Sequence, residues 1–515
     1  MSWEREIREI AQKQALAKNL GGPEGVGRQH NAGRQTIRER IDMLLDPGSF
    51  HEMGAGAGDA ERGADGSLES FTPANFVLGF GALNGRRCVV GGEDFTLRGG
   101  SPNEAGLRKS VYAEELACHY RVPLVRLHEG GGGSVAGAGA KTVGNPPHTP
   151  PRFRSVARAL GTVPVATAAL GPVAGLPASR LVAAHFSVMT EKTAQVLIAG
   201  PAVVAHALNE QKTKEELGGA KVHTRNGVVD NIAKDEADAL DQIRRFLDFL
   251  PLNVRESPPR RAATDDPERG DEALLSLIPR DRRKVFDARR LFAAIVDDGE
   301  FFEMARFYGR GQIIGLARMN GQPVGIMTND SLYYAGAMTD AGARKVRRFV
   351  EFCQTFHLPV INFIDEPGFM IGGESEAAGT IRCGTAAVLA VADCVVPWAS
   401  VIVRKSFGVA QGAHYGPDAY ILAWPSAKMG ALPVEGGVAV AFARDIAASP
   451  DPDARRRELE EQLAAGQSPV ERAESFSMHE LIDPRETRAR LCAWIEWIQP
   501  LLPDLRGPVS FPMRP

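Results

Sequence analysis

The sequence has no pair of cysteines at the spacing that a metal site or a disulfide scaffold needs. Its six cysteines are scattered over 515 residues, and no two of them form a C-x-x-C pair. This spacing argues against a structural zinc site and against a disulfide-rich fold. It is typical of small buried thiols in a reducing compartment.

The chain also lacks an excess of charge and any clear membrane or export segment. It has 60 lysines and arginines against 63 aspartates and glutamates, a net charge of −3. We therefore predict no nucleic-acid binding. The charged N-terminus shows no targeting segment, which favours the cytoplasm or an organelle matrix. The uncharged stretch Ala159 to Ser179 is rich in Ala, Gly and Pro, so we predict buried strand and loop there rather than a membrane span.

Familiar side-chain catalytic motifs are missing as well. The sequence contains no G-x-S-x-G, no G-x-x-x-x-G-K-S/T and no H-E-x-x-H, and no dinucleotide fingerprint in its proper context. We predict no metal site. Isolated histidines are interpreted as surface or hydrogen-bonded structural residues rather than general bases: His148, His185, His223 and His414. The adjacent pair His128 and Glu129 is interpreted as structural, whereas Asp365 and Glu366 could serve either as acid and base or as structural hydrogen-bonding groups.

Glycine, in contrast, is abundant, at 55 of 515 residues. Several glycines stand between a short apolar run and a segment with helical periodicity. Such a turn exposes backbone N–H groups at the start of a helix, and these can bind either a phosphate or an oxyanion. The residues alone leave both possibilities open.

Two helices and one boundary organise the chain. Thr36 and Glu39 form a capping box before an apolar face that ends at Leu45, and a second helix is predicted from about Glu236 to Leu250. Between Glu256 and Glu272 the sequence has no large apolar residue and is rich in proline and charge, which is typical of a linker. We therefore predict two domains, residues 1–258 and 270–515.

The two halves also resemble each other. Asn84-Gly85 matches Asn320-Gly321 at an offset of 236, and both dipeptides are hairpin-turn signals. The same offset relates Pro123 to Pro359 and Glu129 to Asp365, at the start and end of apolar runs that we predict as buried strands. A third pair aligns the segment from Leu170 with that from Phe407, at an offset between 234 and 237. We infer two copies of one α/β unit.

The motifs along the whole chain resemble those of a known family. They include EDFTLRGGSPNEA from Glu93, GPVAGLPASRLVAAHFSVMTEKTAQVLIAGP from Gly171, FIDEPGFMIG from Phe363, VIVRKSFG from Val401 and LIDPRETRARL from Leu481. They are similar to the carboxyltransferase (β) subunits of biotin-dependent acyl-CoA carboxylases, such as the propionyl-CoA and methylcrotonyl-CoA carboxylase β-subunits. The resemblance implies two tandem crotonase-like (ββα spiral) domains of the α/β class, which agrees with the internal repeat.

The family's chemistry implies roles for the glycine turns. Carboxybiotin, carried on a separate subunit, would carboxylate an acyl-CoA thioester through an enolate, with both oxyanions held by backbone N–H groups. By position, one oxyanion hole is Gly175 with Leu176, and the other is Val409 with Ala410, after Gly408. The turn Gly130, Gly131 and Gly132 would line the acyl-CoA channel. The resemblance leaves open which hole serves the thioester and which serves biotin.

The resemblance also implies partners. It places the acyl-CoA on the N-terminal half and biotin on the C-terminal half of a homo-oligomer, usually a hexamer. No biotin-attachment motif and no ATP-grasp domain are visible, so a separate biotin carboxylase and biotin carrier (α-subunit) are expected.

The chain departs from the family at the acyl pocket. Propionyl-type relatives read YGGAYD where this chain reads FGVAQG, so Gly412 replaces an acidic residue. We therefore hypothesise an acyl group other than propionyl, either longer, branched or polar. Two alternatives remain: a biotin-dependent carboxyacyl-CoA decarboxylase subunit, or a non-catalytic scaffold, since Leu176 and Val409 stand where the family has glycines.

Overall fold

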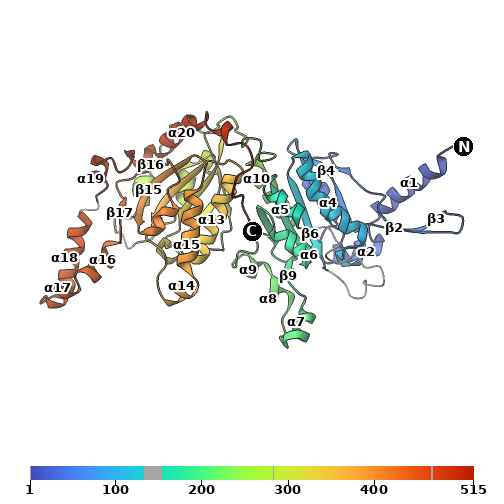
Figure 1. Ribbon diagram of the computed structural model, residues 1–515, viewed down its shortest axis with the longest axis horizontal. Helices are drawn as coiled ribbons and strands as arrows, with labels where there is room; N and C mark the ends of the chain where they lie inside the picture. Colours follow the sequence, from blue (N-terminus) through green and yellow to red (C-terminus); the bar gives the residue numbers. More distant parts are fainter. Residues whose placement is uncertain (1, 133–152, 282–283, 466–467) are drawn as a thin grey trace. The chain divides into compact units, whose positions relative to one another are not determined.

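The computed structural model describes residues 2–132, 153–281, 284–465 and 468–515. The chain divides into two compact units, Met1–Glu256 with Met513–Pro515, and Ser257–Pro512. We call them unit 1 and unit 2. Each is built around one eight-stranded mixed sheet, with helices packed against it (Figure 1).

The two sheets have the same strand order. In unit 1 the order is β1-β4-β5-β6-β7-β8-β10, with β9 paired to β7, and in unit 2 it is β11-β12-β13-β14-β15-β16-β18, with β17 paired to β15. The strands of unit 1 are β1 (His51–Glu52), β4 (Phe76–Leu83), β5 (Arg86–Glu93), β6 (Leu124–Gly130), β7 (Val165–Ala174), β8 (Phe186–Thr190), β9 (Gln195–Leu197) and β10 (Asn231–Ala233). Those of unit 2 are β11 (Phe301–Met304), β12 (Gln312–Met319), β13 (Gln322–Asn329), β14 (Val360–Glu366), β15 (Trp398–Phe407), β16 (Tyr420–Ala423), β17 (Lys428–Gly430) and β18 (Glu480–Leu481). This equivalence confirms the predicted repeat.

Each sheet contains the hairpin that the Asn-Gly dipeptides predict. In β4–β5, Asn84 and Gly85 have φ of 51° and 73°, and in β12–β13, Asn320 and Gly321 have φ of 48° and 75°. Positive φ at both central residues is the geometry of a type I′ turn, whose twist matches that of the strands. The buried strands after Pro123 and Pro359 are β6 and β14, and both pair in parallel with their neighbours.

The predicted helices are also present. Thr36 and Glu39 form the capping box of α3 (Ile37–Leu44), and α10 (Glu236–Asp248) buries an apolar stripe that includes Leu240, Ile243 and Phe246. One long helix covers each sheet, α4 (Glu104–Tyr120) in unit 1 and α13 (Asp340–Thr355) in unit 2, and each begins at a side-chain cap. The stretch Ala159 to Ser179 contains β7, as predicted, and the start of α6 (Leu176–Val182).

The apolar cores lie between these sheets and helices. In unit 1 the strands β4 to β7 pack against α4 and α5 (Arg154–Leu160), and in unit 2 the strands β12 to β16 pack against α12 (Arg289–Ile295) and α20 (Thr487–Ile498). The remaining α-helices of the described chain are α1 (Glu4–Lys18), α2 (Gly22–Asn31), α7 (Pro201–Leu208), α8 (Lys214–Gly218), α9 (Ala220–His223), α11 (Leu274–Leu277), α14 (Gly373–Ala377), α15 (Thr380–Ala392), α16 (Val434–Ala441), α17 (Ala443–Ala448), α18 (Pro452–Ala465) and α19 (Pro469–Glu474).

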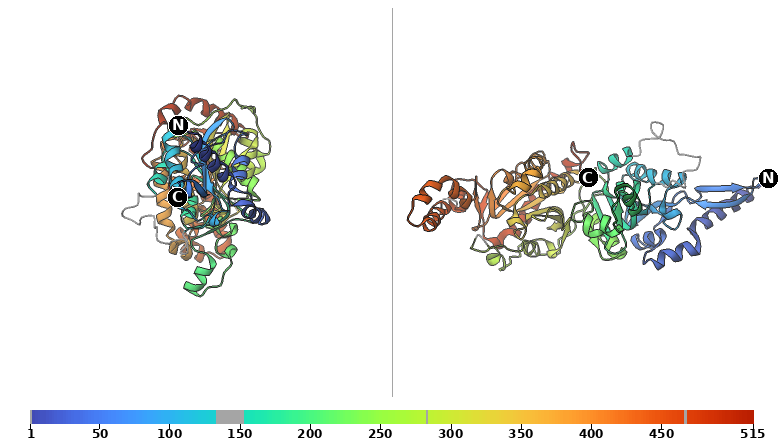
Figure 2. Two further views of the ribbon diagram at one scale, coloured as in Figure 1. Left: turned by 90° about the vertical axis from the view of Figure 1, so that its right-hand side faces the viewer. Right: turned by 90° about the horizontal axis from the view of Figure 1, so that it is seen from below.

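Some elements project from the sheets. In unit 1 the hairpin of β2 (Gly58–Arg62) and β3 (Leu68–Pro73) extends beside α1, and in unit 2 the helices α17 and α18 extend away from the sheet (Figure 2). Among the described helices, none has both the length and the apolar character that a membrane crossing requires.

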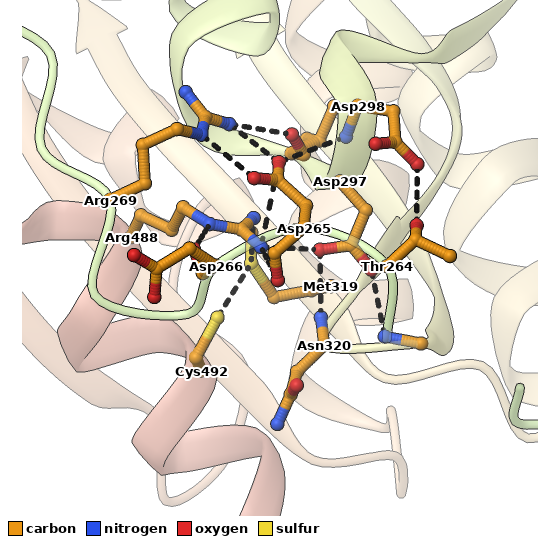
Figure 3. Close-up of polar contacts among 12 residues, drawn as sticks. Thr264, Asp265, Asp266, Arg269, Asp297, Asp298, Met319, Asn320, Arg488 and Cys492 are labelled. Atoms are coloured by element: carbon orange, nitrogen blue, oxygen red, sulfur yellow. Dashed lines mark hydrogen bonds and ion pairs between the residues drawn. The ribbon is translucent and has the colours of Figure 1, made fainter. Parts of the chain in front are cut away.

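The segment that reads as a linker in the sequence is packed onto unit 2 (Figure 3). Arg488, on α20 and 1% exposed, donates to Asp297 at 2.8 Å and to the backbone oxygen of Asp266 at 2.7 Å. Arg269 donates to both carboxylate oxygens of Asp265, at 3.0 and 2.8 Å. Asp265 and Arg269 of this stretch therefore belong to a network with Arg488 at the start of unit 2, although other charged residues of the stretch, such as Glu268 and Glu272, are exposed.

Candidate active site

In unit 1, the strand β7 leads through Gly175 into α6. Gly175 has φ of 66° and ψ of −127°, a conformation that L side chains rarely adopt. A Cβ atom at this residue would lie 2.8 Å from the Cα of Gly132. Glycine is therefore needed here for both the backbone conformation and the close approach of the neighbouring loop.

The loop that approaches Gly175 is the predicted substrate turn. Gly130 still belongs to β6, the N–H of Gly131 donates to the Gly99 oxygen at 3.1 Å, and the Ser101 hydroxyl donates to the Gly132 oxygen at 2.9 Å. The structure thus brings Gly130, Gly131 and Gly132 together with Gly175 and Leu176 at the carboxyl ends of β6 and β7.

Unit 2 repeats the turn at the end of β15. Gly408, with φ of 66° and ψ of −164°, leads from β15 into the short 3₁₀ helix η4 (Val409–Ala413). The surroundings are more open than in unit 1, because the nearest atom to a Cβ at Gly408 would be the Ala431 oxygen at 3.6 Å. Gly412 lies elsewhere on η4 and faces α15, where a Cβ would lie 3.2 Å from a methyl of Val388.

The equivalent glycines correct one alignment made from the sequence. Gly175 and Gly408 hold the same place after β7 and β15, so their offset is 408 − 175 = 233, outside the predicted 234 to 237. The alignment from Leu170 was wrong because β6 and β7 are joined by a longer connection than β14 and β15, and the sequence does not show where the difference falls.

The same equivalence reveals that the two predicted N–H pairs are not at matching positions. Gly175 with Leu176 corresponds to Gly408 with Val409, and Ala410 corresponds to Pro177, which has no N–H group. Within the described chain, the N–H groups of Leu176, Val409 and Ala410 have no hydrogen-bond acceptor. Ala410 is fully buried, so its N–H is a buried donor without an acceptor among the described residues, whereas the neighbouring Val409 is exposed.

A cleft of about 760 Å³ lies in unit 2 beside this turn. Phe407, which precedes Gly408, lines it together with Trp424 and Val434, and the positively charged Arg280, Arg404, Lys405 and Lys428 also reach it. No carboxylate is found among the described residues that line the cleft. Such a cleft is large enough for a small molecule with an apolar body and a polar or anionic group.

A buried carboxylate near the end of β6 and of β14 is bound by arginine, a pairing that the sequence analysis did not predict. In unit 1, the fully buried Glu129 lies 2.6 Å from Arg40 Nη1 and 3.1 Å from Arg34 Nε. In unit 2, Arg404 donates to both carboxylate oxygens of Asp365, at 2.9 and 2.6 Å. The internal repeat aligned Glu129 with Asp365. Of the two roles left open for Asp365, the structure shows the structural one, as a hydrogen-bonded partner of Arg404.

The described histidines that the sequence analysis singled out are hydrogen bonded, as it expected. His128 and His414 are fully buried beside carboxylates, His185 is fully buried between backbone groups, and His223 contacts the Val196 oxygen at 2.7 Å. His148 lies outside the described residues. Burial lowers the pKa of His128, although Glu93, at 3.1 Å, opposes that shift.

Comparison with known proteins now assigns these features to a family. Residues 28–499 match the model of the carboxyl transferase domain. The chain belongs to this carboxyl transferase family. It is 34% identical over 500 residues to the carboxyltransferase subunit of propionyl-CoA carboxylase from Haloferax mediterranei, covering 96% of both chains. It is 32% identical to the α subunit of methylmalonyl-CoA decarboxylase from Veillonella parvula, covering 94% of both chains.

Solved structures give the same result. The transcarboxylase 12S hexamer, determined with methylmalonyl-CoA and methylmalonic acid bound, superposes with a TM-score of 0.85 at 30% identity, covering 97% of this chain and 96% of that chain. The predicted family, the two tandem crotonase-like domains and the carboxyltransferase activity are thereby confirmed.

Proposed function

We propose that this carboxyltransferase is the β-type subunit of a biotin-dependent acyl-CoA carboxylase that moves a carboxyl group from carboxybiotin to an acyl-CoA. The observation that carries the proposal is the pair of glycine turns, Gly175 and Gly408, at equivalent strand ends, followed by backbone N–H groups that have no acceptor among the described residues. Two such donor sites suit a reaction with two developing oxyanions, the enolate of the thioester and the ureido oxygen of biotin.

The residues of the chain would bind and orient rather than exchange protons. Gly175 and Leu176 would donate to one oxyanion, and Val409 and Ala410 to the other. Carboxybiotin, carried on a partner protein, would supply the CO₂ and the nitrogen that takes the α-proton of the thioester. This division fits a site in which the nearby buried carboxylates Glu129 and Asp365 are already bound by arginines. Removing one such donor typically slows catalysis by about 100- to 1,000-fold.

The predicted N-terminal domain, residues 1–258, would hold the acyl-CoA, with the turn from Gly130 to Gly132 along its channel. The predicted C-terminal domain, residues 270–515, would hold the biotin end. The open turn at Gly408 and the adjacent cleft leave space for a bicyclic group of biotin's size, which supports this assignment.

The acyl group is proposed to be other than propionyl. Propionyl-type sequences have an acidic residue where this chain has Gly412, and a side chain at Gly412 would meet Val388 of α15. The proposal rests on this difference in side chain at Gly412. A longer, branched or polar acyl group would be consistent with it, and a strong preference for propionyl-CoA in a survey of thioesters would contradict it.

We further propose that the chain forms a homo-oligomer, by similarity to the hexameric transcarboxylase 12S core, and that it works with a biotin carboxylase and a biotin carrier in the cytoplasm or an organelle matrix. The alternative direction, biotin-dependent decarboxylation, is consistent with one observation, the 32% identity to the methylmalonyl-CoA decarboxylase subunit, which does not favour it over carboxylation.

The test is decarboxylation of a panel of carboxyacyl-CoA thioesters by the purified protein, with and without free biotin. This half-reaction needs no partner subunit. Biotin-stimulated loss of carboxylate from one thioester would support the proposed mechanism and give the substrate class. No turnover on any thioester, together with capture of a biotinylated partner by the intact protein, would favour the scaffold instead.

A further inference from the structure

His414 ends the short helix η4, and its ring is held in one orientation. Its Nδ1 lies 2.9 Å from Nδ2 of Asn362, and its Nε2 lies 3.0 Å from Oε2 of Glu366. An amide nitrogen can only donate, so Nδ1 accepts and the ring proton is on Nε2, which donates to Glu366. All three residues are fully buried.

The backbone of His414 is held just as firmly. Its carbonyl oxygen accepts from Trp398 Nε1 at 3.2 Å, from Ser400 Oγ at 2.8 Å and from Asn362 Nδ2 at 3.1 Å. Asn362 lies on β14, and Trp398 and Ser400 lie on β15. The C-terminal end of η4 is therefore attached to the two strands whose ends form the site.

Glu366 connects this end to a third strand and to the next loop. Its Oε2 also accepts from Asn329 Nδ2 at 2.9 Å, at the end of β13, and its Oε1 accepts from the Gly368 N–H at 2.9 Å. One carboxylate thus joins the ends of β13 and β14 to η4. Its described hydrogen-bond donors are an imidazole, an amide and a backbone N–H, which are directional groups.

We propose that His414 and Glu366 are positioning residues that hold η4, and with it the N–H groups of Val409 and Ala410, in the geometry the reaction needs. The proposal deepens the proposed function of this turn and rests on it. A single 3₁₀ turn of five residues has little stability of its own, so its orientation must come from its attachments. At its other end, a 3.2 Å bond from the Gly408 N–H to the Gly430 oxygen anchors the turn.

The test compares His414→Met with a matched control, His185→Met. Both histidines are fully buried and hydrogen bonded, but His185 contacts backbone groups of Leu160 and Val165 in unit 1. In His414→Met, we expect hydrogen exchange of the amides of residues 408–413 to accelerate by about tenfold or more, without the same change in 175–182. In His185→Met, exchange in 408–413 should stay as in wild type.

Kinetics of the biotin-stimulated half-reaction give the second readout. His414→Met should lower kcat by about 10- to 100-fold with KM for the thioester unchanged, because a misplaced N–H donor stabilises the transition state less well. His414→Gln retains an N–H that can reach Glu366 and should recover part of the loss. Unchanged exchange in 408–413, or equal acceleration in both Met variants, would overturn the proposal. Absence of wild-type turnover on every thioester would count against the proposed function, whereas the exchange comparison would still decide the positioning role.

Discussion

The turns after β7 and β15 have glycines with the same φ of 66°, yet their surroundings differ. Gly175 lies against Gly132 of the neighbouring loop, whereas Gly408 has no atom within 3.4 Å of a hypothetical Cβ. The second residue after the glycine is Pro177 in unit 1 and Ala410 in unit 2. One turn is therefore crowded and lacks a donor at this position, and the other is open and keeps that donor.

The buried carboxylates near the two turns also differ in their partners. Glu129 is paired with Arg40, which is also bound to Glu236, and with Arg34, so three charged partners share one network. Asp365 is bound by Arg404, and the neighbouring Glu366 by neutral donors. The comparison shows that the two units share a backbone fold but differ in the polar contacts near the turn. Equivalent substitutions in the two units should therefore have effects of different size.

The largest effect on stability is expected from removing the arginine of unit 2. Arg404→Met would leave Asp365 buried without its paired arginine, which should cost about 3–5 kcal/mol of unfolding free energy. Arg34→Met should cost less, because Glu129 keeps its ion pair with the buried Arg40 at 2.6 Å. Thermal unfolding of both variants checks the order, with Arg28→Met as control, since the Arg28–Glu24 pair is exposed and should contribute about 0–1 kcal/mol. Equal losses at Arg34 and Arg404 would contradict the difference between a carboxylate with two arginine partners and one with a single arginine partner.

A methyl group at each glycine tests the difference in crowding. Gly175→Ala should lower turnover by about 100-fold, because the added Cβ would lie 2.8 Å from the Gly132 Cα in addition to the strain of positive φ. Gly408→Ala meets only the backbone strain, about 1–3 kcal/mol, and should retain more activity. Gly33→Ala is the control for a methyl group at a positive φ in open space, since Gly33 has φ of 72° and no atom within 4 Å of a Cβ. A larger loss at Gly408 than at Gly175 would refute the crowding argument.

The hairpin turns give a smaller contrast. Asp46 accepts from the N–H groups of Asn84 and Gly85, at 3.0 and 2.8 Å, and Asp297 accepts from those of Asn320 and Gly321, at 3.0 and 2.7 Å. Asp297 is also bound by the buried Arg488 (Figure 3). Asp297→Asn should therefore cost about 1–3 kcal/mol, and Asp46→Asn less than about 1 kcal/mol, in denaturant unfolding. The reverse order would show that the network of Arg488 does not stabilise unit 2.

The smallest effect concerns pH. Burial lowers the pKa of His128, so this histidine stays neutral in the folded chain, whereas in the unfolded chain it gains a proton below about pH 6.5. The contribution of His128 to the unfolding free energy is therefore fully present above that pH, and it is lost as the pH falls towards the lowered pKa. His128→Gln should therefore lose less thermal stability than wild type between neutral pH and about pH 5.5. His119→Gln, at an exposed position of α4, should behave as wild type. An unchanged pH dependence in His128→Gln would contradict the assignment.

Much of the fold was predictable because its signals are local. The capping box at Thr36 and the Asn-Gly turns are short motifs, and the offset of 236 between the halves revealed the repeat. The glycines of both turns were also found. What the sequence did not reveal was how distant charges pair, such as Arg40 with Glu129 or the segment near Asp265 with Arg488.

A signal for part of this network was nevertheless present. Arg40 stands on the apolar face of its helix beside Ile37, Ile41 and Leu44, and Arg404 follows the apolar run of a buried strand. A charged residue on a buried face predicts a buried partner, although the sequence cannot name it. The third alignment failed because the spatial equivalence of Gly175 and Gly408 depends on the lengths of the β6–β7 and β14–β15 connections, which the sequence does not show.

The most direct measurement exchanges the residues that distinguish the two turns. Ala410→Pro removes one backbone donor from unit 2, and Pro177 shows that the equivalent position in unit 1 accommodates a proline. Biotin-stimulated decarboxylation should fall by about 100- to 1,000-fold in Ala410→Pro with the fold retained, and Pro177→Ala, which adds an N–H to unit 1, should keep near wild-type turnover. A folded Ala410→Pro variant with undiminished biotin-stimulated turnover would contradict catalysis by backbone donors at this turn.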